Sequence, residues 1–195
     1  MNYSEIRNCD IANGPGVRVT LFVSGCTHHC AGCFNEMTWD FDYGAPFDEG
    51  TEERLLTFLE PGYIAGLTLL GGEPMEYANW CRLLPFLKKV RDIYPEKDIW
   101  CYTGYCFETD ILKRFCRQWE DMKEFLACID VLVDGEFILE QKDISLQFRG
   151  SRNQRIILVQ ESLACGETVL WREAGSQSIG QDRRTAKQRV GESLV

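Results

Sequence analysis

This sequence of 195 residues lacks a long hydrophobic run and an excess of positive charge. No stretch approaches the ~18 apolar residues of a membrane-spanning helix, and residues 1–8 contain no apolar core of the kind that signal peptides need. Lys and Arg number 21 against 30 Asp and Glu, a net charge of −9. Nonspecific binding to nucleic acid or to membrane surfaces requires a cationic face. We therefore expect a cytoplasmic protein that binds neither nucleic acid nor membrane.

The composition is typical of a folded domain. Hydrophobic residues make up 45% of the chain, with 11 Phe, 7 Tyr and 5 Trp, which excludes a wholly disordered chain. The length corresponds to one domain. The end of the sequence is polar and has no apolar stripe, so we predict a core domain over residues 1–173 and a mobile tail over 174–195.

Ten cysteines are many for a chain of this kind. In a reducing compartment they indicate metal binding or redox chemistry rather than a disulfide framework. Only Cys26, Cys30 and Cys33 lie close together in the sequence. The other seven are scattered, and we interpret most of them as small buried hydrophobic residues.

Apolar, β-branched segments alternate with segments of helical periodicity. Helices are predicted over 51–59, with Thr51 as a possible N-cap, over 77–88, with Pro85 as a kink or break, and along the face of Phe107, Ile111, Phe115 and Trp119. This alternation predicts an α/β fold with a mostly parallel sheet. A full eight-stranded barrel takes ~250 residues, so the sheet is expected to be open or a partial barrel. The predicted strands are 17–23, 64–70, 98–102, 129–133 and 155–159.

Cys26, Cys30 and Cys33 follow the first predicted strand, separated by three and then two residues. Cysteine thiolates are the usual ligands of iron–sulfur clusters. Three ligands in one loop would leave one iron of a 4Fe–4S cluster open to a substrate. The alternative is a structural zinc site that adds His28 or His29. Zinc sites generally pair ligands from two separated knuckles, which this sequence lacks, so the open cluster is favoured and neither histidine is assigned a role.

Gly71-Gly72-Glu73-Pro74 follows the second predicted strand. Two glycines let a ligand lie against the backbone, and the carboxylate of Glu73 can pair with an ammonium group. Two further motifs, Thr103-Gly104-Tyr105 and Asp134-Gly135-Glu136, follow later strands. Ligands of parallel α/β sheets bind at the carboxyl ends of the strands. We therefore expect all four motifs, the cysteine loop included, to line one edge of the sheet.

Together these motifs resemble the radical S-adenosylmethionine enzymes. The segments before the cysteines, Asn13 to Arg18 and Phe22 to Cys26, look like those of the activases of glycyl-radical enzymes within that superfamily. The resemblance covers about Cys9 to Trp171. Three later stretches, 102–105, 130–137 and 148–155, narrow it to the activases whose partner is an anaerobic ribonucleoside-triphosphate reductase.

The resemblance implies an oxidoreductase with a radical SAM fold, an incomplete barrel. Cys26, Cys30 and Cys33 would hold a 4Fe–4S cluster whose fourth iron chelates S-adenosyl-L-methionine. Gly71, Gly72 and Glu73 would receive the amino group of that cofactor, backbone near Phe34 would face its adenine, and Asp134 would shape the strand-end site. The loop from Arg149 to Arg155 would contact the partner or the cofactor carboxylate, or be a solvated basic loop.

The implied reaction generates a glycyl radical on the reductase and draws its electron from a low-potential donor such as a flavodoxin. Three alternatives stay open: an activase of another glycyl-radical enzyme, such as a formate-lyase type, a zinc-stabilised binding module, and a plain electron carrier. Only residues 34–70 separate Cys33 from Gly71, with no further Cys among them. This short spacing disfavours the longer activases that carry a ferredoxin-like insertion there.

Overall fold

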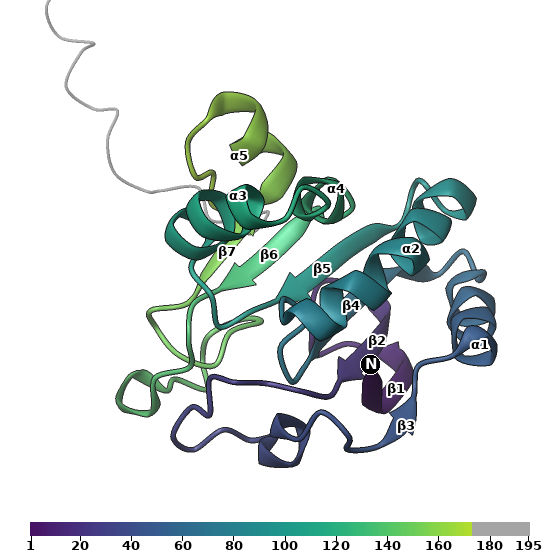
Figure 1. Ribbon diagram of the computed structural model, residues 1–195, viewed down its shortest axis with the longest axis horizontal. Helices are drawn as coiled ribbons and strands as arrows, with labels where there is room; N and C mark the ends of the chain where they lie inside the picture. The colour runs from purple at the N-terminus through teal and green to yellow at the C-terminus, as the bar shows by residue number, and fades with distance from the viewer. Residues whose placement is uncertain (173–195) are drawn as a thin grey trace, which may run out of the picture.

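A seven-stranded sheet forms the centre of the computed structural model, which describes residues 1–172 (Figure 1). The strand order is β3-β1-β2-β4-β5-β6-β7. The central strands run parallel to one another, which confirms the predicted α/β class. They lie within a residue or two of their predicted bounds: β2 (Val17–Val23), β4 (Ile64–Gly71), β5 (Asp98–Tyr102) and β6 (Val131–Asp134).

The outer strands make the sheet mixed. At one side β1 (Asn2–Asp10) pairs antiparallel with β2 and with the short β3 (Ala45–Pro46). Strand β1 was not predicted, because most of its residues are polar and none of its sequence shows an apolar run. At the other side β7 (Arg155–Leu158), predicted as 155–159, runs antiparallel to β6. No α-helix crosses over between β6 and β7, only a loop with the single turn η3 (Leu139–Gln141), so the chain returns in the opposite direction.

Two helices differ from their predicted form. Helix α1 (Glu49–Leu59) begins before Thr51, and Asp48 is its N-cap because the Asp48 carboxylate accepts a hydrogen bond from the Thr51 N–H at 2.9 Å. Helix α2 (Tyr77–Ile93) continues through Pro85, so the predicted break does not occur. Of the described residues, none belongs to a helix that is both long and apolar enough to cross a membrane. The predicted tail, 174–195, lies outside the described residues.

The aromatic face predicted as helical is wound differently from an α-helix. Phe107–Phe115 forms a π-helix, η2, and the short helices α3 (Cys116–Gln118) and α4 (Met122–Ala127) follow it. Phe107, Ile111 and Phe115 are buried at intervals of four residues. An α-helix repeats every 3.6 residues, whereas the wider π turn keeps side chains four apart closer to one line. Three members of the predicted apolar face are therefore present, on a different helix type, whereas the fourth, Trp119, follows α3 with an extended backbone.

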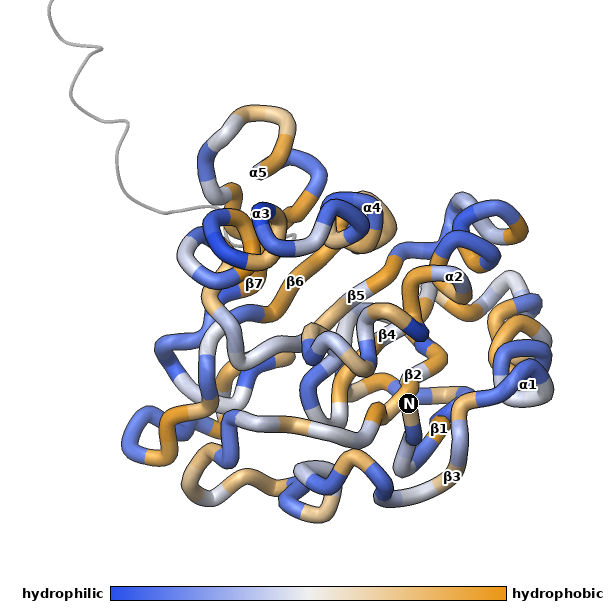
Figure 2. The backbone as a smooth tube through the Cα atoms, in the orientation of Figure 1, coloured by the Kyte–Doolittle hydropathy of each residue, from blue (hydrophilic) through white to orange (hydrophobic). Residues whose placement is uncertain are grey.

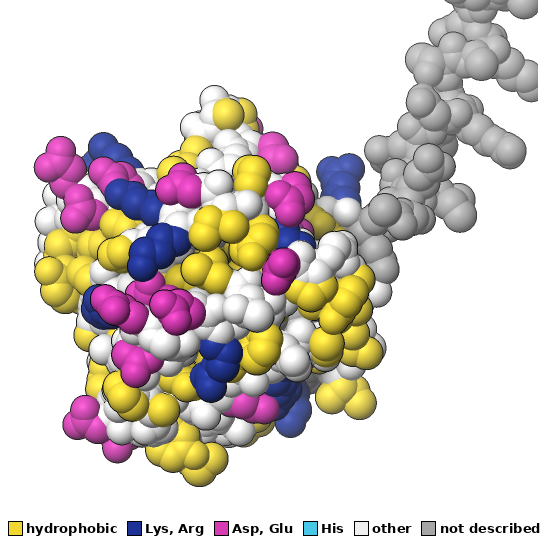
Figure 3. Space-filling model, turned by 90° about the vertical axis from the view of Figure 1, so that its right-hand side faces the viewer, with side chains coloured by type: hydrophobic (Ala, Val, Ile, Leu, Met, Phe, Trp, Pro, Cys, Tyr) yellow, Lys and Arg dark blue, Asp and Glu magenta, His cyan; other side chains and the backbone are white. Residues whose placement is uncertain are grey.

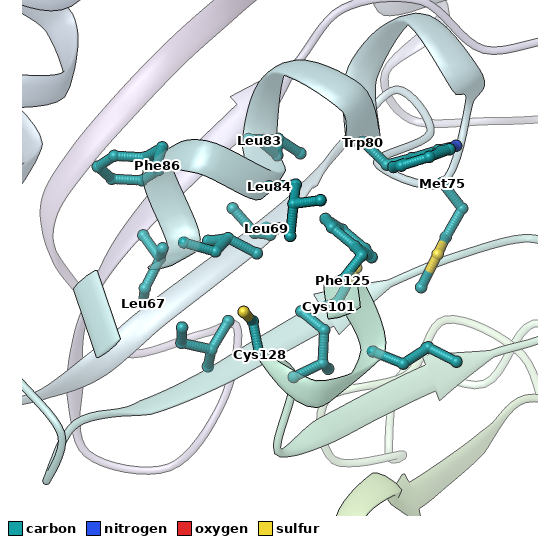
Figure 4. Packing of buried hydrophobic residues seen from close by; sticks show 14 of the residues in the cluster. Leu67, Leu69, Met75, Trp80, Leu83, Leu84, Phe86, Cys101, Phe125 and Cys128 are labelled. Atoms are coloured by element: carbon teal, nitrogen blue, oxygen red, sulfur yellow. The ribbon is translucent and has the colours of Figure 1, made fainter. Parts of the chain in front are cut away.

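The helices cover one face of the sheet. Alternate residues of the strands, among them Leu67, Leu69 and Cys101, pack there against Leu83, Phe86 and Phe125 (Figure 4). The hydropathy colouring shows the apolar strands β4 to β7 as largely orange tube between more polar connections (Figure 2). Because this core holds the strands in register, it also fixes where their carboxyl ends meet.

The other face of the sheet is partly polar. Arg18 is fully buried there, with Nε 2.7 Å from Thr68 Oγ1 and Nη2 2.6 Å from Asp98 Oδ1. These bonds compensate the cost of burying its charge. A second, smaller cluster on this face contains Trp100, Val131, Val133 and Ile156. This face is where the loops that follow the strands fold over the sheet.

Candidate metal centre

Residues of all four predicted strand-end motifs line one pocket, with a volume of about 130 Å³. We call it the cluster pocket. It lies at the carboxyl ends of the parallel strands β2, β4, β5 and β6, as the sheet geometry predicts. The residues that the motifs contribute are Cys26, Cys30, Cys33, Gly71, Gly72, Glu73, Thr103, Gly104 and Gly135.

The three thiols of the cysteine loop are free and lie close enough to influence one another. Burial raises the pKa of the Cys26 thiol to about 12, and burial also raises the pKa of Cys30. Backbone N–H groups at His28 and His29 point at the Cys26 sulfur and oppose this shift. Because a metal ligand is a thiolate, binding iron would release these protons.

The three thiols of the cysteine loop are not grouped as the ligands of one bound ion would be. Tetrahedral zinc with Zn–S bonds of 2.3 Å brings its ligand atoms within about 4 Å of one another. Among the described residues, the one group of metal-binding side chains whose ligand atoms all lie within 4.8 Å is Cys106, Glu108 and Asp134. The three loop cysteines do not meet this criterion, alone or with His28 or His29. A single-ion zinc site is therefore disfavoured in this arrangement.

The glycine turn after β4 packs directly against the cysteine loop. The N–H of Gly72 donates to Val23 O at 2.7 Å, and the N–H of Glu73 donates to Gly25 O at 2.8 Å. A Cβ atom on Gly72 would lie 2.6 Å from Gly25 O and 2.9 Å from Thr38 O. Both contacts are with backbone that cannot move aside cheaply, so this position requires glycine. The two glycines thus serve close packing of the loops as well as access for a ligand.

Glu73 is buried, with 1% of its surface exposed, and its carboxylate is held on three sides. It accepts hydrogen bonds from the N–H groups of Met75 at 2.8 Å and Gly104 at 2.7 Å. Its Oε2 also lies 3.0 Å from Nε2 of His28. Burial lowers the pKa of His28, but the hydrogen bond and charge of Glu73 outweigh it and the net shift is upward. His28 therefore pairs with the carboxylate that the sequence predicted to receive an ammonium group.

Two residues near the start of α2 join these loops, and sequence reasoning missed both. Asn79 is fully buried, and its Nδ2 donates to the carbonyls of Ser24 at 3.0 Å, Gly25 at 3.3 Å and Glu73 at 2.9 Å. Glu76 accepts bonds from the Thr27 hydroxyl and from the Thr27 N–H at 3.2 Å. Asn79 shares the buried face of α2 with Leu83 and Phe86, which differs from the face that the sequence predicted.

Asp134 does not line the cluster pocket. Its carboxylate accepts a bond from the Phe107 N–H at 2.9 Å and pairs with Arg155, whose Nε is 3.0 Å from Oδ1. The same guanidinium reaches Glu108 at 2.7 Å and Cys106 Sγ at 3.8 Å. The group of Cys106, Glu108 and Asp134 therefore already surrounds a cation, the side chain of Arg155. Asp134 joins η2 to the ends of β6 and β7 and influences the pocket through the position of these elements.

The remaining predicted residues lie around the opening of the pocket. Phe34 lines it, yet its side chain is 86% exposed. Gln154, from the loop 149–155, also lines the pocket, and its Nε2 donates to Gly135 O at 3.0 Å. The loop therefore contacts the turn after β6 through Gln154. The guanidinium of Arg155 pairs with acidic residues of this chain. On the molecular face shown in Figure 3, acidic and basic side chains are interspersed.

Comparison with known proteins places the chain in a class of iron–sulfur proteins. Residues 12–157 match the model of a family described as a 4Fe-4S single cluster domain. The chain is similar to anaerobic ribonucleoside-triphosphate reductase-activating proteins from three bacteria, and in each case the match covers 80% of this chain. The sequence is 46% identical to the protein of Pasteurella multocida, and the match covers 96% of that protein. It is 46% identical to the protein of Haemophilus influenzae and 43% identical to that of Vibrio cholerae, and each of these matches covers 97% of the relative.

The chain belongs to the family of anaerobic ribonucleoside-triphosphate reductase-activating proteins, within the 4Fe–4S single cluster class. The matched segment contains all four strand-end motifs, the cysteine loop included. The donor set agrees with this class, since three thiols of one loop share a pocket and thiolates are the usual ligands of iron–sulfur clusters.

Proposed function

We propose that this protein activates an anaerobic ribonucleoside-triphosphate reductase as a radical S-adenosylmethionine enzyme. The observation that carries the proposal is the meeting of three free thiols, a glycine turn and a buried carboxylate in one pocket at the strand ends. The names of the relatives supply the partner, and the family description supplies the cluster. The mixed sheet, too small for a closed barrel, supports a partial barrel of the radical SAM type with one edge open to a protein substrate.

Each residue of the cluster pocket has a task in this proposal. Cys26, Cys30 and Cys33 hold a 4Fe–4S cluster with one iron open. Gly71 and Gly72 present bare backbone to S-adenosylmethionine, and Glu73 attracts its ammonium group, although His28 already contacts that carboxylate. Phe34, exposed at the rim, offers its ring and backbone to the adenine.

When bound, the cluster would supply the single electron, drawn from a low-potential donor such as a flavodoxin, that reductive cleavage of S-adenosylmethionine requires. The hydrogen atom that is removed would come from a glycine of the reductase. The protein's contribution is to position these groups and to limit access to them. Asn79 and Glu76 fix the cysteine loop against the glycine turn, so that the ligands are held in place before the cofactor arrives.

An anaerobic experiment tests the proposal. Reconstituted protein is mixed with reductant, S-adenosylmethionine and the reductase, and electron paramagnetic resonance follows the reductase. We expect a carbon-centred doublet on the reductase and one equivalent of 5′-deoxyadenosine per radical. A cluster-loaded protein that neither binds nor cleaves S-adenosylmethionine would indicate a plain electron carrier. Stoichiometric zinc after anaerobic purification would indicate a binding module.

The identity of the partner needs its own control. An activase of a formate-lyase type would produce the doublet on that enzyme and not on the ribonucleotide reductase. Both substrates are therefore offered in parallel at equal concentration. The relatives' names favour the ribonucleotide reductase.

A further inference from the structure

Aromatic rings form a continuous series of contacts from the cysteine loop to the molecular surface. The ring of His28, within the loop, lies 4.4 Å from the ring of Tyr105, measured between centroids. Tyr105 packs against Phe115 at 4.8 Å, and Phe115 packs against Trp119 at 5.1 Å. Trp119 in turn contacts Tyr77, with centroids 5.3 Å apart. The series therefore joins the loop after β2 to the first residue of α2.

The outer end of this series is exposed. Tyr77 is 54% exposed, and Trp119 beside it is only partly buried. We call the surface formed by these two side chains the aromatic surface. Large aromatic side chains are enriched in the interfaces between proteins, because they offer a broad contact area with few rotatable bonds. The aromatic surface is therefore suited to contact with another molecule.

Hydrogen bonds also connect the aromatic surface to the cysteine loop. Glu76, which precedes Tyr77, accepts bonds from the Thr27 N–H at 3.2 Å and from the Tyr105 hydroxyl at 3.2 Å. Thr27 follows Cys26 directly in the sequence. Electron tunnelling decays more slowly through bonds and packed side chains than through empty space. Of the two sides of the cysteine loop, this one therefore links a predicted cluster ligand to the surface through a short, fully packed path.

The surface next to Trp119 is basic. The end of η2 and the helix α3 contain Lys113, Arg114 and Arg117, with no acidic residue between Asp110 and Glu120. Arg114 pairs with Asp110 at 3.1 Å. Lys113 and Arg117 form no ion pair within residues 1–172, so their charges can meet a partner. On a chain of net charge −9, this local positive charge favours a partner whose surface is acidic.

We propose that the aromatic surface is the docking site of the electron donor, a low-potential flavoprotein whose flavin edge packs against Tyr77 and Trp119 and whose surrounding surface is acidic. The inference rests on the proposed function, which requires an electron at the cluster. One electron leaves the reduced flavin, which is thereby oxidised by one electron, and the cluster is reduced by one electron, with no bond formed or broken. Flat aromatic side chains suit the planar flavin, and Lys113 and Arg117 suit the acidic surface around it.

The donor could bind there while the cluster pocket is in use. Tyr77 and Trp119 do not line that pocket, and Trp119 packs against the main core on the helix-covered side of the sheet. Phe34, at the opening of the pocket, adjoins Phe148, which packs on the opposite side of the sheet. The aromatic surface therefore leaves the opening free for S-adenosylmethionine and for the reductase.

Binding of an oxidised flavodoxin to the cluster-loaded protein tests the docking site, with calorimetry giving the Kd. We expect Arg117→Glu to raise the Kd about tenfold, since it reverses a charge that faces the donor. Tyr77→Ala should raise it about fivefold by removing contact area. The matched controls are Arg54→Glu, at an exposed site on α1, and Tyr63→Ala, 65% exposed before the amino end of β4. Both controls should bind as wild type does.

Reduction of the cluster gives a second readout, followed by the loss of its visible absorbance. With reduced flavodoxin below saturation, both variants should react more slowly than wild type, in proportion to the change in Kd. With dithionite, a small reductant that needs no docking surface, they should match wild type in reduction and in cleavage of S-adenosylmethionine. Added salt should weaken flavodoxin binding more in wild type than in Arg117→Glu.

Three results would overturn the docking site: a wild-type Kd in both variants, no binding of flavodoxin by the wild type, or an equal loss of rate with dithionite. The first two would show that the donor does not use the aromatic surface, and the third that the substitutions damage the cluster itself. Failure of the wild type to cleave S-adenosylmethionine with dithionite would overturn the proposed function instead.

Discussion

Nε2 of His28 lies 3.0 Å from Oε2 of Glu73, and this contact joins the cysteine loop to the glycine turn. The carboxylate is 1% exposed and also holds the N–H groups of Met75 and Gly104. Three strand-end segments therefore meet at one side chain. The predicted ligand-binding carboxylate is also a structural centre, so its replacement should affect both stability and binding.

Glu73→Gln tests both effects, each with its own measurement. A glutamine offers one acceptor oxygen, so it cannot accept from both N–H groups and pair with His28. We expect the free energy of unfolding to fall by about 1.5–3 kcal/mol, and the Kd for S-adenosylmethionine to rise at least tenfold under the proposed function. Thermal melts and anaerobic equilibrium binding provide the measurements. Glu60→Gln, at an exposed site, is the control. Unchanged stability would contradict the hydrogen bonds described here.

Gly72→Ala should push the glycine turn away from the cysteine loop, because its Cβ would lie 2.6 Å from Gly25 O. Overpacking of this kind costs about 1–3 kcal/mol. We expect a lower urea midpoint and less iron per chain after anaerobic reconstitution. Gly62→Ala is the matched control, since nothing lies within 4 Å of a Cβ there. Equal iron content in the two variants would show that the turn tolerates the extra carbon.

Asn79→Leu should leave the carbonyls of Ser24, Gly25 and Glu73 without their shared donor. Buried acceptors that lose a partner cost about 1–3 kcal/mol. We expect the unfolding midpoint in urea to fall and cluster retention to drop with it. Asn2→Leu removes a single exposed bond, to Asp42 O, and should change stability by less than about 0.5 kcal/mol. A wild-type midpoint for Asn79→Leu would exclude its role in joining the loops.

Cys30→Ala should abolish retention of the cluster, because two thiolates cannot hold three irons of the cube. Iron analysis and the visible absorbance of anaerobically reconstituted protein measure this, with about four irons per wild-type chain expected. Cys9→Ala is the control, since Cys9 is exposed and distant in sequence from the loop. A fully active, iron-loaded Cys30→Ala protein is incompatible with the assigned ligand set.

Glu108 should make the free energy of unfolding depend on pH in the acidic range. The hydrogen bond from Arg155 lowers the pKa of Glu108 well below its usual value. A lowered folded-state pKa contributes stability that is present above the unfolded pKa, about 4.3, and is lost as the pH falls toward the folded value. Glu108→Gln should therefore melt below wild type at pH 7, and the difference should shrink below about pH 4. A difference that stays constant from pH 7 to pH 3 would rule out this ion pair as the cause.

Much of the fold was readable from local sequence patterns. The bounds of β2 and β5 match their predictions, because short, apolar, β-branched runs have few other ways to be buried. The polar strand β1 and the direction of β7 were not readable. An edge strand lacks a distinctive apolar pattern, and strand direction depends on the route of the connecting loop.

The closeness of the three loop cysteines and the order of the strand-end motifs were determined by the sequence alone, since three thiols within eight residues lie near one another in almost any fold. Only the tertiary structure decided what surrounds them. His28 meets Glu73 across 45 positions of sequence, and Asn79 reaches Ser24 across 55. The guanidinium of Arg155 pairs with the carboxylates of Asp134 and Glu108 in its own chain. Contacts over such separations depend on the order and packing of all the strands and helices, and a local sequence pattern does not specify this arrangement.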